Sequence, residues 1–460
     1  MNTHRSVILL EFNELTPFLI DRFIDAGKLP NFQRFKRESQ VYVTDAEEAQ
    51  DHLNPWIQWV TVHCGLSFAE HGVFHLGDGH KLTHKCIWDV LSDAGLPVWV
   101  CGSMNAKYHL PLHGYVLPDP WTTIAAPYPE ELVTLFRFVQ RNVQEHTKEQ
   151  VTLSRTDLLR FLSFMLTHGL SVSTTAAVLK QLLEERIHAS RWKRAVLLDK
   201  IQWDVFRWYY LKAKPAFATF FLNSTAHFQH KYWRNMEPEH FTIQPTADEQ
   251  ARLQTAILFG YQEMDKLLGR FLHLASGQTA LVLSTGLSQQ PCLTYEDQGG
   301  KTFYRPHDFD RLLEFAGVSA PHTCAPVMSE QFHVYFTTEE DAHDAARRLE
   351  ALRVADGPAM LVQHEGAAVF SGCRVFRQLP QDALLSSADS SRLAPFFKIF
   401  YQADGTKSGM HHPDGVLWIR RPDRQHSVHP KKVPLRAIAP TILNMLGVRR
   451  PDSMRAEPLA

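Results

Sequence analysis

The sequence predicts an α/β fold in which a mostly parallel central sheet is packed between layers of helices. Three apolar runs of strand length, Ser6–Leu10, Pro97–Cys101 and Ala216–Leu222, are typical of strands buried on both faces. Helical patterns alternate with these runs, as in doubly wound parallel sheets. The chain has 460 residues, more than one compact core usually holds, so we expect insertions or a second domain.

The first strand and helix lie at the N-terminus. The run Ser6–Leu10 predicts a buried strand that delivers Glu11 and Asn13 to the edge of the sheet. A helix is expected to open at Pro17, because proline suits the first helical turn, and to end near Gly27.

The alternation continues through the first quarter of the chain. Val41–Thr44 predicts a short strand, and Asn54 followed by Pro55 predicts the start of the next helix, with Asn54 as its cap. A helix over Cys86–Ala94 then precedes the strand Pro97–Cys101.

The alternation of predicted strands and helices stops after Pro127. From Pro129 to about Leu211, apolar residues recur at spacings of three and four, which predicts a helical insertion that covers one side of the site as a cap. Strands resume at Ala216, and a helix over Ala247–Leu274 precedes a buried strand over Thr279–Leu283.

The last third combines a small α+β subdomain with a return to the core. Alternating strands and a helix over Glu339–Leu352 indicate the subdomain, whereas Gly409–Ile419 and a final amphipathic helix belong to the core. We therefore divide the chain into core residues 1–127, a helical insertion at 128–213, core residues 214–300, an α+β subdomain at 301–405 and C-terminal core residues 406–460.

Composition argues against several classes of function. With 48 basic and 49 acidic residues, the sequence predicts no nucleic-acid partner and no membrane surface. The six cysteines have no paired short spacing, which argues against a disulfide framework or a zinc ribbon. The N-terminal apolar run Val7–Leu10 is too short for a signal peptide, and no run reaches about 18 apolar residues, so a cytoplasmic protein is expected. The sequence makes no prediction about the oligomeric state.

Polar residues follow several predicted core strands. Asn223 and His227 come after the strand that begins at Ala216, while Thr285 and His411 lie near later strands. Because ligands of open α/β sheets bind outside the carboxyl ends of the strands, these residues are candidates for one shared site. The alternative for Asn223 is a helix cap, and that for the histidines is an ordinary surface position.

Motifs at both ends of the chain resemble the alkaline phosphatase superfamily, in particular its type I phosphodiesterase/nucleotide pyrophosphatase branch. They run, in order, VILLEFNELTPFLIDRFIDAGKLPNFQRF, GLSFAEHGVFHLGD, CIWDVLSDAGLPVWVCGS, LNSTAH, SGMHHPDGVLWI and IAPTILNMLGV. The resemblance leaves out the helical insertion. It implies an alkaline phosphatase-like three-layer sandwich.

The resemblance also implies metal ligands. One metal of this family takes an Asp, a His four residues later and a His near the C-terminus, positions that correspond here to Asn223, His227 and His411. The other metal takes an acid after the first strand, which is Glu11, and an adjacent Asp-His pair. Thr285 and Gly286 stand at that pair and cannot replace it.

The family nucleophile has no counterpart in this chain. Its position falls on Leu53 or, counted from Gly65, on Pro55, and neither supplies a hydroxyl or a thiol. Thr61 and Cys64 lie well inside the predicted helix. We therefore expect this protein to lack ordinary two-metal phosphatase activity.

Two functions remain open. The first is a divergent hydrolase or transferase of a phosphate- or sulfate-type ester, with at most one divalent metal, a water nucleophile, and Glu11 and Asn13 as catalytic candidates. The second is a pseudoenzyme that binds a sugar, a nucleotide or a protein partner. The cofactor is one zinc or other divalent cation, or none, and the substrate is a small-molecule or glycan-type ester. Substrate-binding candidates are Thr285, His71, His230 and His412.

For some of these candidates a plainer role competes. His71 could instead buttress the adjoining helix, and His230 and His412 could support the metal ligands from outside or lie on the surface.

Overall fold

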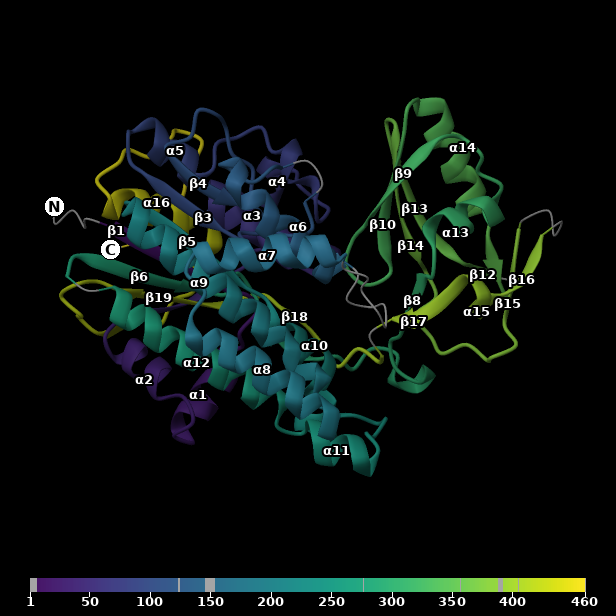
Figure 1. The fold of residues 1–460 in the computed structure, drawn as a ribbon, viewed down its shortest axis with the longest axis horizontal. Coiled ribbons are helices and arrows are strands. Elements are labelled where there is room, and N and C mark those ends of the chain that lie inside the picture. The colour runs from purple at the N-terminus through teal and green to yellow at the C-terminus, as the bar shows by residue number, and fades with distance from the viewer. Residues whose placement is uncertain are drawn as a thin grey trace.

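The chain forms a large α/β body and a smaller lobe beside it (Figure 1). The structure is a computed structural model. It describes residues 6–122, 125–144, 154–275, 277–355, 357–387, 392–403 and 405–459. In Figure 1 the small lobe, drawn in green, lies to the right of the body.

The body is built on a nine-stranded sheet in the order β20-β2-β19-β6-β1-β5-β3-β4, with β21 paired to β2. Strand β1 lies between β5 and β6 and pairs with both in parallel, whereas β19 runs antiparallel to β6 and β2. The strands are β1 (Ser6–Phe12), β2 (Gln40–Asp45), β3 (Val98–Cys101), β4 (Gly114–Leu117), β5 (Phe217–Leu222), β6 (Thr279–Ser284), β19 (Asp414–Arg420), β20 (Ser427–Val428) and β21 (Val433–Pro434).

Helices cover both faces of this sheet. Side chains of β1 alternate between the two faces, so that Ile8 and Leu10 join one apolar cluster and Val7 and Leu9 the other. The first cluster is completed by α1, α2, α10 and α12, and the second by α3, α5 and α16. These helices are α1 (Pro17–Asp25), α2 (Pro30–Arg37), α3 (Pro55–Cys64), α5 (Ile87–Asp93), α10 (Ser224–Met236), α12 (Ala256–Leu274) and α16 (Ile438–Met445). The predicted fold class, a three-layer sandwich with a mostly parallel sheet, is confirmed.

The segment expected as a helical insertion contains α6 (Val133–Gln144), α7 (Arg155–Thr167), α8 (Val172–Ile187) and α9 (Ala195–Ala213). Residues 145–153 lie outside the described part of the chain. Helix α9 packs against the core, where Gln202 Nε2 donates to the Phe221 carbonyl at 2.7 Å. Among the helices that the structure describes, none is long and apolar enough to cross a membrane.

The small lobe has its own apolar core and two four-stranded sheets. One sheet has the order β13-β14-β10-β9, and the other β12-β11-β15-β16. Its elements are β8 (Phe303–Pro306), α13 (Phe309–Ala316), β9 (His322–Pro326), β10 (Gln331–Phe336), α14 (Glu339–Glu350), β11 (Arg353–Val354), β12 (Gly357–Pro358), β13 (Met360–Glu365), β14 (Ala368–Cys373), β15 (Leu384–Ser386), β16 (Leu393–Pro395), α15 (Phe396–Ile399) and β17 (Phe400–Ala403).

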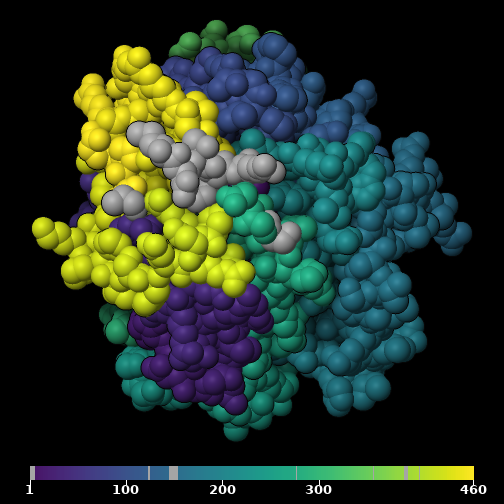
Figure 2. All heavy atoms as spheres, turned by 90° about the vertical axis from the view of Figure 1, so that its left-hand side faces the viewer, coloured from purple at the N-terminus to yellow at the C-terminus, as the bar shows by residue number. Residues whose placement is uncertain are grey.

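A two-stranded ribbon lies beside the main sheet and includes a segment from the C-terminal part of the chain. Strand β7 (Ser288–Pro291) pairs antiparallel with β18 (Gly409–His412), with His411 opposite Gln289. Figure 2 shows that C-terminal residues (yellow) also lie beside N-terminal residues (purple). In the sequence segments concerned, the Arg420 guanidinium on β19 contacts the Glu38 carboxylate after α2 at 2.6 Å.

Two elements differ from the sequence prediction. Strand β1 continues through Glu11 to Phe12 instead of ending before Glu11. The helix expected over Ala247–Leu274 is two helices, α11 (Ala247–Leu253) and α12, because the chain turns at Gln254 and Thr255.

We predict that Gly114→Ala destabilises the fold by about 2–3 kcal/mol, measured as the free energy of unfolding in urea. An added Cβ at Gly114, where φ is 147°, would lie 1.9 Å from the Val98 carbonyl oxygen, so β3 and β4 would have to separate. Gly357→Ala is the matched control, because its Cβ would meet the Val354 carbonyl oxygen at an ordinary 3.6 Å. Equal stability of the two variants would contradict the β3–β4 pairing.

Candidate metal site

The carboxyl ends of the three central strands meet at one edge of the sheet. In the parallel register Phe12 lies opposite Leu222, and the next residues, Asn13 and Asn223, are joined by their side chains. Asn13 Nδ2 donates to Asn223 Oδ1 at 2.8 Å, and Trp59 Nε1 donates to Asn13 Oδ1 at 2.7 Å. Both amides are therefore held in fixed orientations at the point where the strands end.

Glu14 follows directly and takes a left-handed backbone conformation, with φ of 60°. Its N–H donates to the Thr285 carbonyl at 3.0 Å, and its own carbonyl accepts from Gln229 Nε2 at 2.8 Å. Non-glycine residues rarely adopt this conformation, which costs free energy and persists only where the surroundings impose it. The backbone thus turns the Glu14 side chain back over the sheet edge, where it is 2% exposed.

Four polar side chains surround the Glu14 carboxylate. Asn13 Nδ2 donates to Oε1 at 2.8 Å, and Gln289 Nε2 donates to Oε2. His230 Nε2 lies 3.0 Å from Oε2, and His411 Nε2 lies 3.6 Å from the same oxygen. The two amides hold the two carboxylate oxygens, and the two imidazoles lie beside Oε2.

Both imidazoles are oriented by backbone carbonyl groups. His230, on α10, donates from Nδ1 to the Gly409 carbonyl at 2.9 Å. His411, on β18, donates from Nδ1 to the Leu53 carbonyl at 2.7 Å. Because each Nδ1 donates to a backbone carbonyl, Nε2 is the ring nitrogen that faces Glu14 in both histidines, and His230 Nε2 is hydrogen-bonded to the Glu14 carboxylate.

Burial and charge set the ionisation of this cluster. Burial opposes ionisation of Glu14, but the charges of His230 and His411 and hydrogen bonds from His230 and Gln289 lower its pKa to about 2. Burial lowers the pKa of His411 to about 3, so its Nε2 carries a lone pair at neutral pH. An anionic oxygen and a nitrogen lone pair therefore face each other.

Glu14, His230 and His411 fit a divalent cation. Their ligand atoms all lie within 4.8 Å of one another. Two imidazoles and one carboxylate with an open fourth position form a ligand set that holds zinc in hydrolytic enzymes. Histidine ligands that donate their other ring N–H to a carbonyl are typical of such sites. The residues present are thus suited to a single metal ion.

Glu11 lies inside β1 and not among these groups. Its carboxylate accepts from His63 Nε2 at 2.8 Å and from Ser103 Oγ at 2.7 Å, and the side chain is fully buried. Because strand side chains alternate, Glu11 shares the face of Val7 and Leu9 and points into the layer of α3.

Three of the substrate-binding candidates make local contacts instead. The Thr285 hydroxyl accepts from the Val416 N–H at 2.8 Å and is fully buried. His71 contacts Thr61 Oγ1 at 3.2 Å, and burial lowers its pKa to about 4. His412 Nδ1 accepts from the Asp414 N–H at 3.2 Å.

The metal set expected from the resemblance shares His411 with the cluster. His411 lies in the cluster, and Asn223 borders it through its bond to Asn13. His227 lies on α10 one turn before His230, and it is His230 that joins Glu14 and His411. The set Asn223, His227 and His411 stays a prediction.

The position of the family nucleophile is beside the cluster. Leu53, whose carbonyl binds His411, precedes α3 and is buried. Farther along α3, Thr61 contacts His71, and burial raises the pKa of the Cys64 thiol to about 12. At this pKa the thiol is protonated at neutral pH and is a poor nucleophile.

Sequence reasoning missed Glu14 and Gln289. A usable signal was present for Glu14, since the apolar run of β1 resumes at Phe12 after Glu11, and the first carboxylate beyond the strand is Glu14. No comparable signal marks Gln289, because its place depends on the pairing of β7 with β18.

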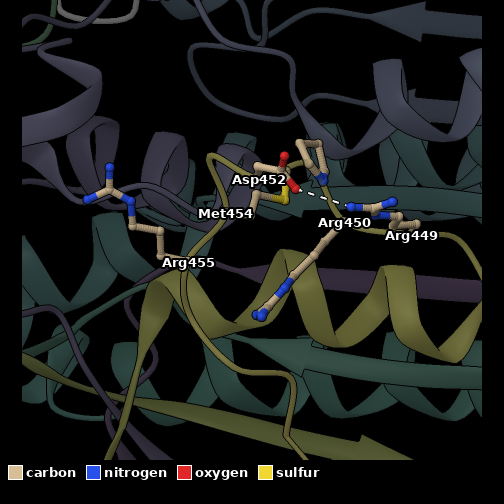
Figure 3. A pocket seen from close by; sticks show the side chains of 6 residues that line it. Arg449, Arg450, Asp452, Met454 and Arg455 are labelled. Carbon is tan, nitrogen blue, oxygen red and sulfur yellow. Dashed lines mark ion pairs between the residues drawn. The ribbon is translucent and has the colours of Figure 1, made fainter.

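A separate cavity of about 460 Å³ lies near the C-terminus (Figure 3). Its arginines have acidic partners: Arg449 pairs with Asp452 at 3.5 Å, and Arg450 pairs with Glu457 at 2.7 Å. None of the cluster residues lines it.

No model of a protein family matches the chain, and no curated protein matches it. Among solved structures, the chain is similar to murine ectonucleotide pyrophosphatase/phosphodiesterase 5, with 9% identity and a TM-score of 0.40 over 97% of this chain and 96% of the other. It is similar to phosphonoacetate hydrolase from Sinorhizobium meliloti in complex with phosphonoformate, with 13% identity and a TM-score of 0.39 over 97% and 96%. It is also similar to the alkaline phosphatase PafA, with 12% identity and a TM-score of 0.42 over 100% and 99%.

The first and third of these structures carry the names of the branch and of the superfamily that the sequence motifs resemble.

We predict that Glu11→Gln lowers the free energy of unfolding by about 1–3 kcal/mol, because one of the two buried donors, His63 or Ser103, would face the amide NH₂. Urea unfolding followed by fluorescence measures this change. Glu239→Gln, at an exposed position, is the control and is expected to unfold like the wild type. If Glu11→Gln were as stable as this control, the buried network would contribute nothing.

Proposed function

We propose that Glu14, His230 and His411 bind one divalent cation, and that this centre hydrolyses or transfers a phosphate- or sulfate-type ester. The observation that most directly supports this proposal is the orientation of the two imidazoles toward the Glu14 carboxylate. Each imidazole has its Nδ1 on a backbone carbonyl and its Nε2 toward one buried carboxylate. Holding Glu14 in a left-handed conformation costs free energy that a bound cation would offset.

A divalent ion at this site, with zinc as the first candidate, would polarise an ester oxygen and lower the pKa of a water molecule. The protein's own groups would orient the ligands: Asn13 and Gln289 fix the two oxygens of Glu14, and the carbonyl groups of Gly409 and Leu53 fix the imidazoles. Since Leu53 offers no hydroxyl or thiol, the nucleophile in this proposal is water.

An anionic ester suits the charges around the cluster. Lys407 interacts electrostatically with Glu14 and His411, and its backbone N–H donates to the Lys301 carbonyl at 2.8 Å. Burial lowers the pKa of Lys407, as does the charge of Lys301. A phosphate or sulfate group bound beside Lys407 would compensate these two cations, as it would in the ester class that the sequence resemblance implies.

The general base is not Glu11 in this proposal. Its carboxylate is committed to His63 and Ser103, and it lies one strand position before the end of β1. Those contacts favour a structural role. Asn13, the second catalytic candidate, is instead proposed to position Glu14.

The helical insertion is proposed to border the site through α9. Ser224 Oγ, beside Asn223, donates to the carboxylate of Asp199 on α9. Gln202, on the same helix, binds the carbonyl of Phe221 at the end of β5. These contacts support the earlier expectation that the insertion covers one side of the site as a cap.

A binding protein of the same fold is the second candidate. It is favoured by Leu53 and Pro55 at the nucleophile position and by Thr285 and Gly286 in place of an Asp-His pair. Such a protein would hold a sugar, a nucleotide or a partner protein without hydrolysing it.

We predict that His411→Ala and Glu14→Gln each lower the zinc affinity of the Glu14 cluster at least about 100-fold relative to the wild type. Each variant should therefore retain one equivalent of zinc fewer than the wild type. Isothermal titration and metal analysis of the full chain measure this loss. Glu11→Gln and His412→Ala are matched controls and should bind zinc like the wild type. Loss of zinc in His227→Ala with retention in Glu14→Gln would instead support the ligand set implied by the family.

We further predict that ester hydrolysis, where present, depends on the same ligands and leaves no covalent intermediate. Nucleotide, sugar, aryl phosphate, diester and sulfate substrates should be assayed with zinc, magnesium and manganese, and simple aryl esters are expected to give negligible turnover. Hydrolysis of a larger ester that is abolished in His411→Ala supports the enzyme. Binding of a ligand without turnover supports the second candidate.

A further inference from the structure

The small lobe contains a second group of ligand side chains. Asp310 lies in the first turn of α13, and His322 and Cys324 lie on β9. His322 and Cys324 are two residues apart on one strand, so their side chains point to the same face. Strand β9 is an edge strand of its sheet, and the His322 side chain contacts Asp310 at the start of α13.

The three ligand atoms converge. His322 Nε2 lies 3.1 Å from Asp310 Oδ1, and Cys324 Sγ lies 4.0 Å from the same oxygen. All three atoms are within 4.8 Å of one another. His322 donates from Nδ1 to the Ala320 carbonyl at 2.8 Å, which leaves Nε2 toward Asp310.

The surroundings of this group are acidic. The carboxylates of Asp310 and Asp308 both interact electrostatically with the Cys324 thiol. Within the described part of the chain, no lysine or arginine forms an ion pair with Asp308 or Asp310. A bound cation would therefore meet a local excess of negative charge.

We propose that Asp310, His322 and Cys324 bind one zinc-class divalent ion. A thiolate, an imidazole and a carboxylate together favour a borderline-soft ion over calcium or magnesium, which prefer oxygen ligands. Tetrahedral zinc places its ligand atoms about 3.3–3.8 Å apart, so the observed separations need only small side-chain shifts. Water or Asp308 would complete the coordination.

This ion would tie the edge strand β9 to helix α13. Asp310 comes from the helix and the other two ligands come from the strand, so the ion would cross-link two elements of the small lobe. The site is independent of the Glu14 cluster, because it shares no residue with it.

The first experiment titrates the full-length protein with Co²⁺ and follows the thiolate-to-metal absorption band. This band reports only a metal bound to sulfur, and the Glu14 cluster has no thiol ligand. We expect the band in wild type and in His411→Ala, and its loss in Cys324→Ser and His322→Ala. His364→Ala, at an exposed position on β13, is the matched control and should keep the band.

The second experiment measures alkylation of Cys324 by mass spectrometry, with and without Zn²⁺. Cys324 is half-buried and the other five cysteines are buried, so it should react first. At zinc concentrations of about ten times the dissociation constant, modification should slow roughly tenfold, because only metal-free protein reacts. His322→Ala should lose this protection, and His364→Ala should keep it. Absence of the band in wild type, or unprotected Cys324 at saturating zinc, would overturn the proposal.

Discussion

The parallel pairing of β1 with β5 and β6 is the constraint on which the rest of the structure depends. Strand β1 is covered on both faces, so its side chains within the sheet must be apolar or fully hydrogen-bonded. Glu11 meets this condition through His63 and Ser103. Polar groups that remain available for a ligand can therefore begin only beyond Phe12, where Asn13 and Asn223 join the two strand ends.

Glu14 shows how such an edge becomes a site. A buried carboxylate is costly unless its oxygens are compensated, and here Asn13 and Gln289 supply donors to both oxygens. The left-handed backbone of Glu14 adds a further cost. The contacts of Glu14 with Thr285 and Gln229 hold this backbone conformation, and His230 and His411 present Nε2 to the carboxylate. The cation proposal follows from this arrangement.

The two proposed metal sites lie on different parts of the fold but orient their histidines in the same way. In each, a histidine donates Nδ1–H to a backbone carbonyl, of Gly409, Leu53 or Ala320, and turns Nε2 toward a carboxylate. This arrangement selects the tautomer and removes ring rotation before a ligand arrives. The two sites differ in their metal-ligand atoms. The site at the sheet edge offers oxygen and nitrogen, and the site in the small lobe also offers sulfur. They are consequently expected to differ in metal preference.

The sequence by itself determined the α/β class with a mostly parallel sheet, because buried strands and helices leave periodic apolar patterns. It also showed that Leu53 and Pro55 cannot act as nucleophiles. The tertiary structure alone decided that His230 joins Glu14. His227 and His230 are three residues apart on one helix, and only the packing of α10 against the β7–β18 ribbon selects between them. That choice depends on contacts between segments about 180 residues apart, which no local pattern encodes.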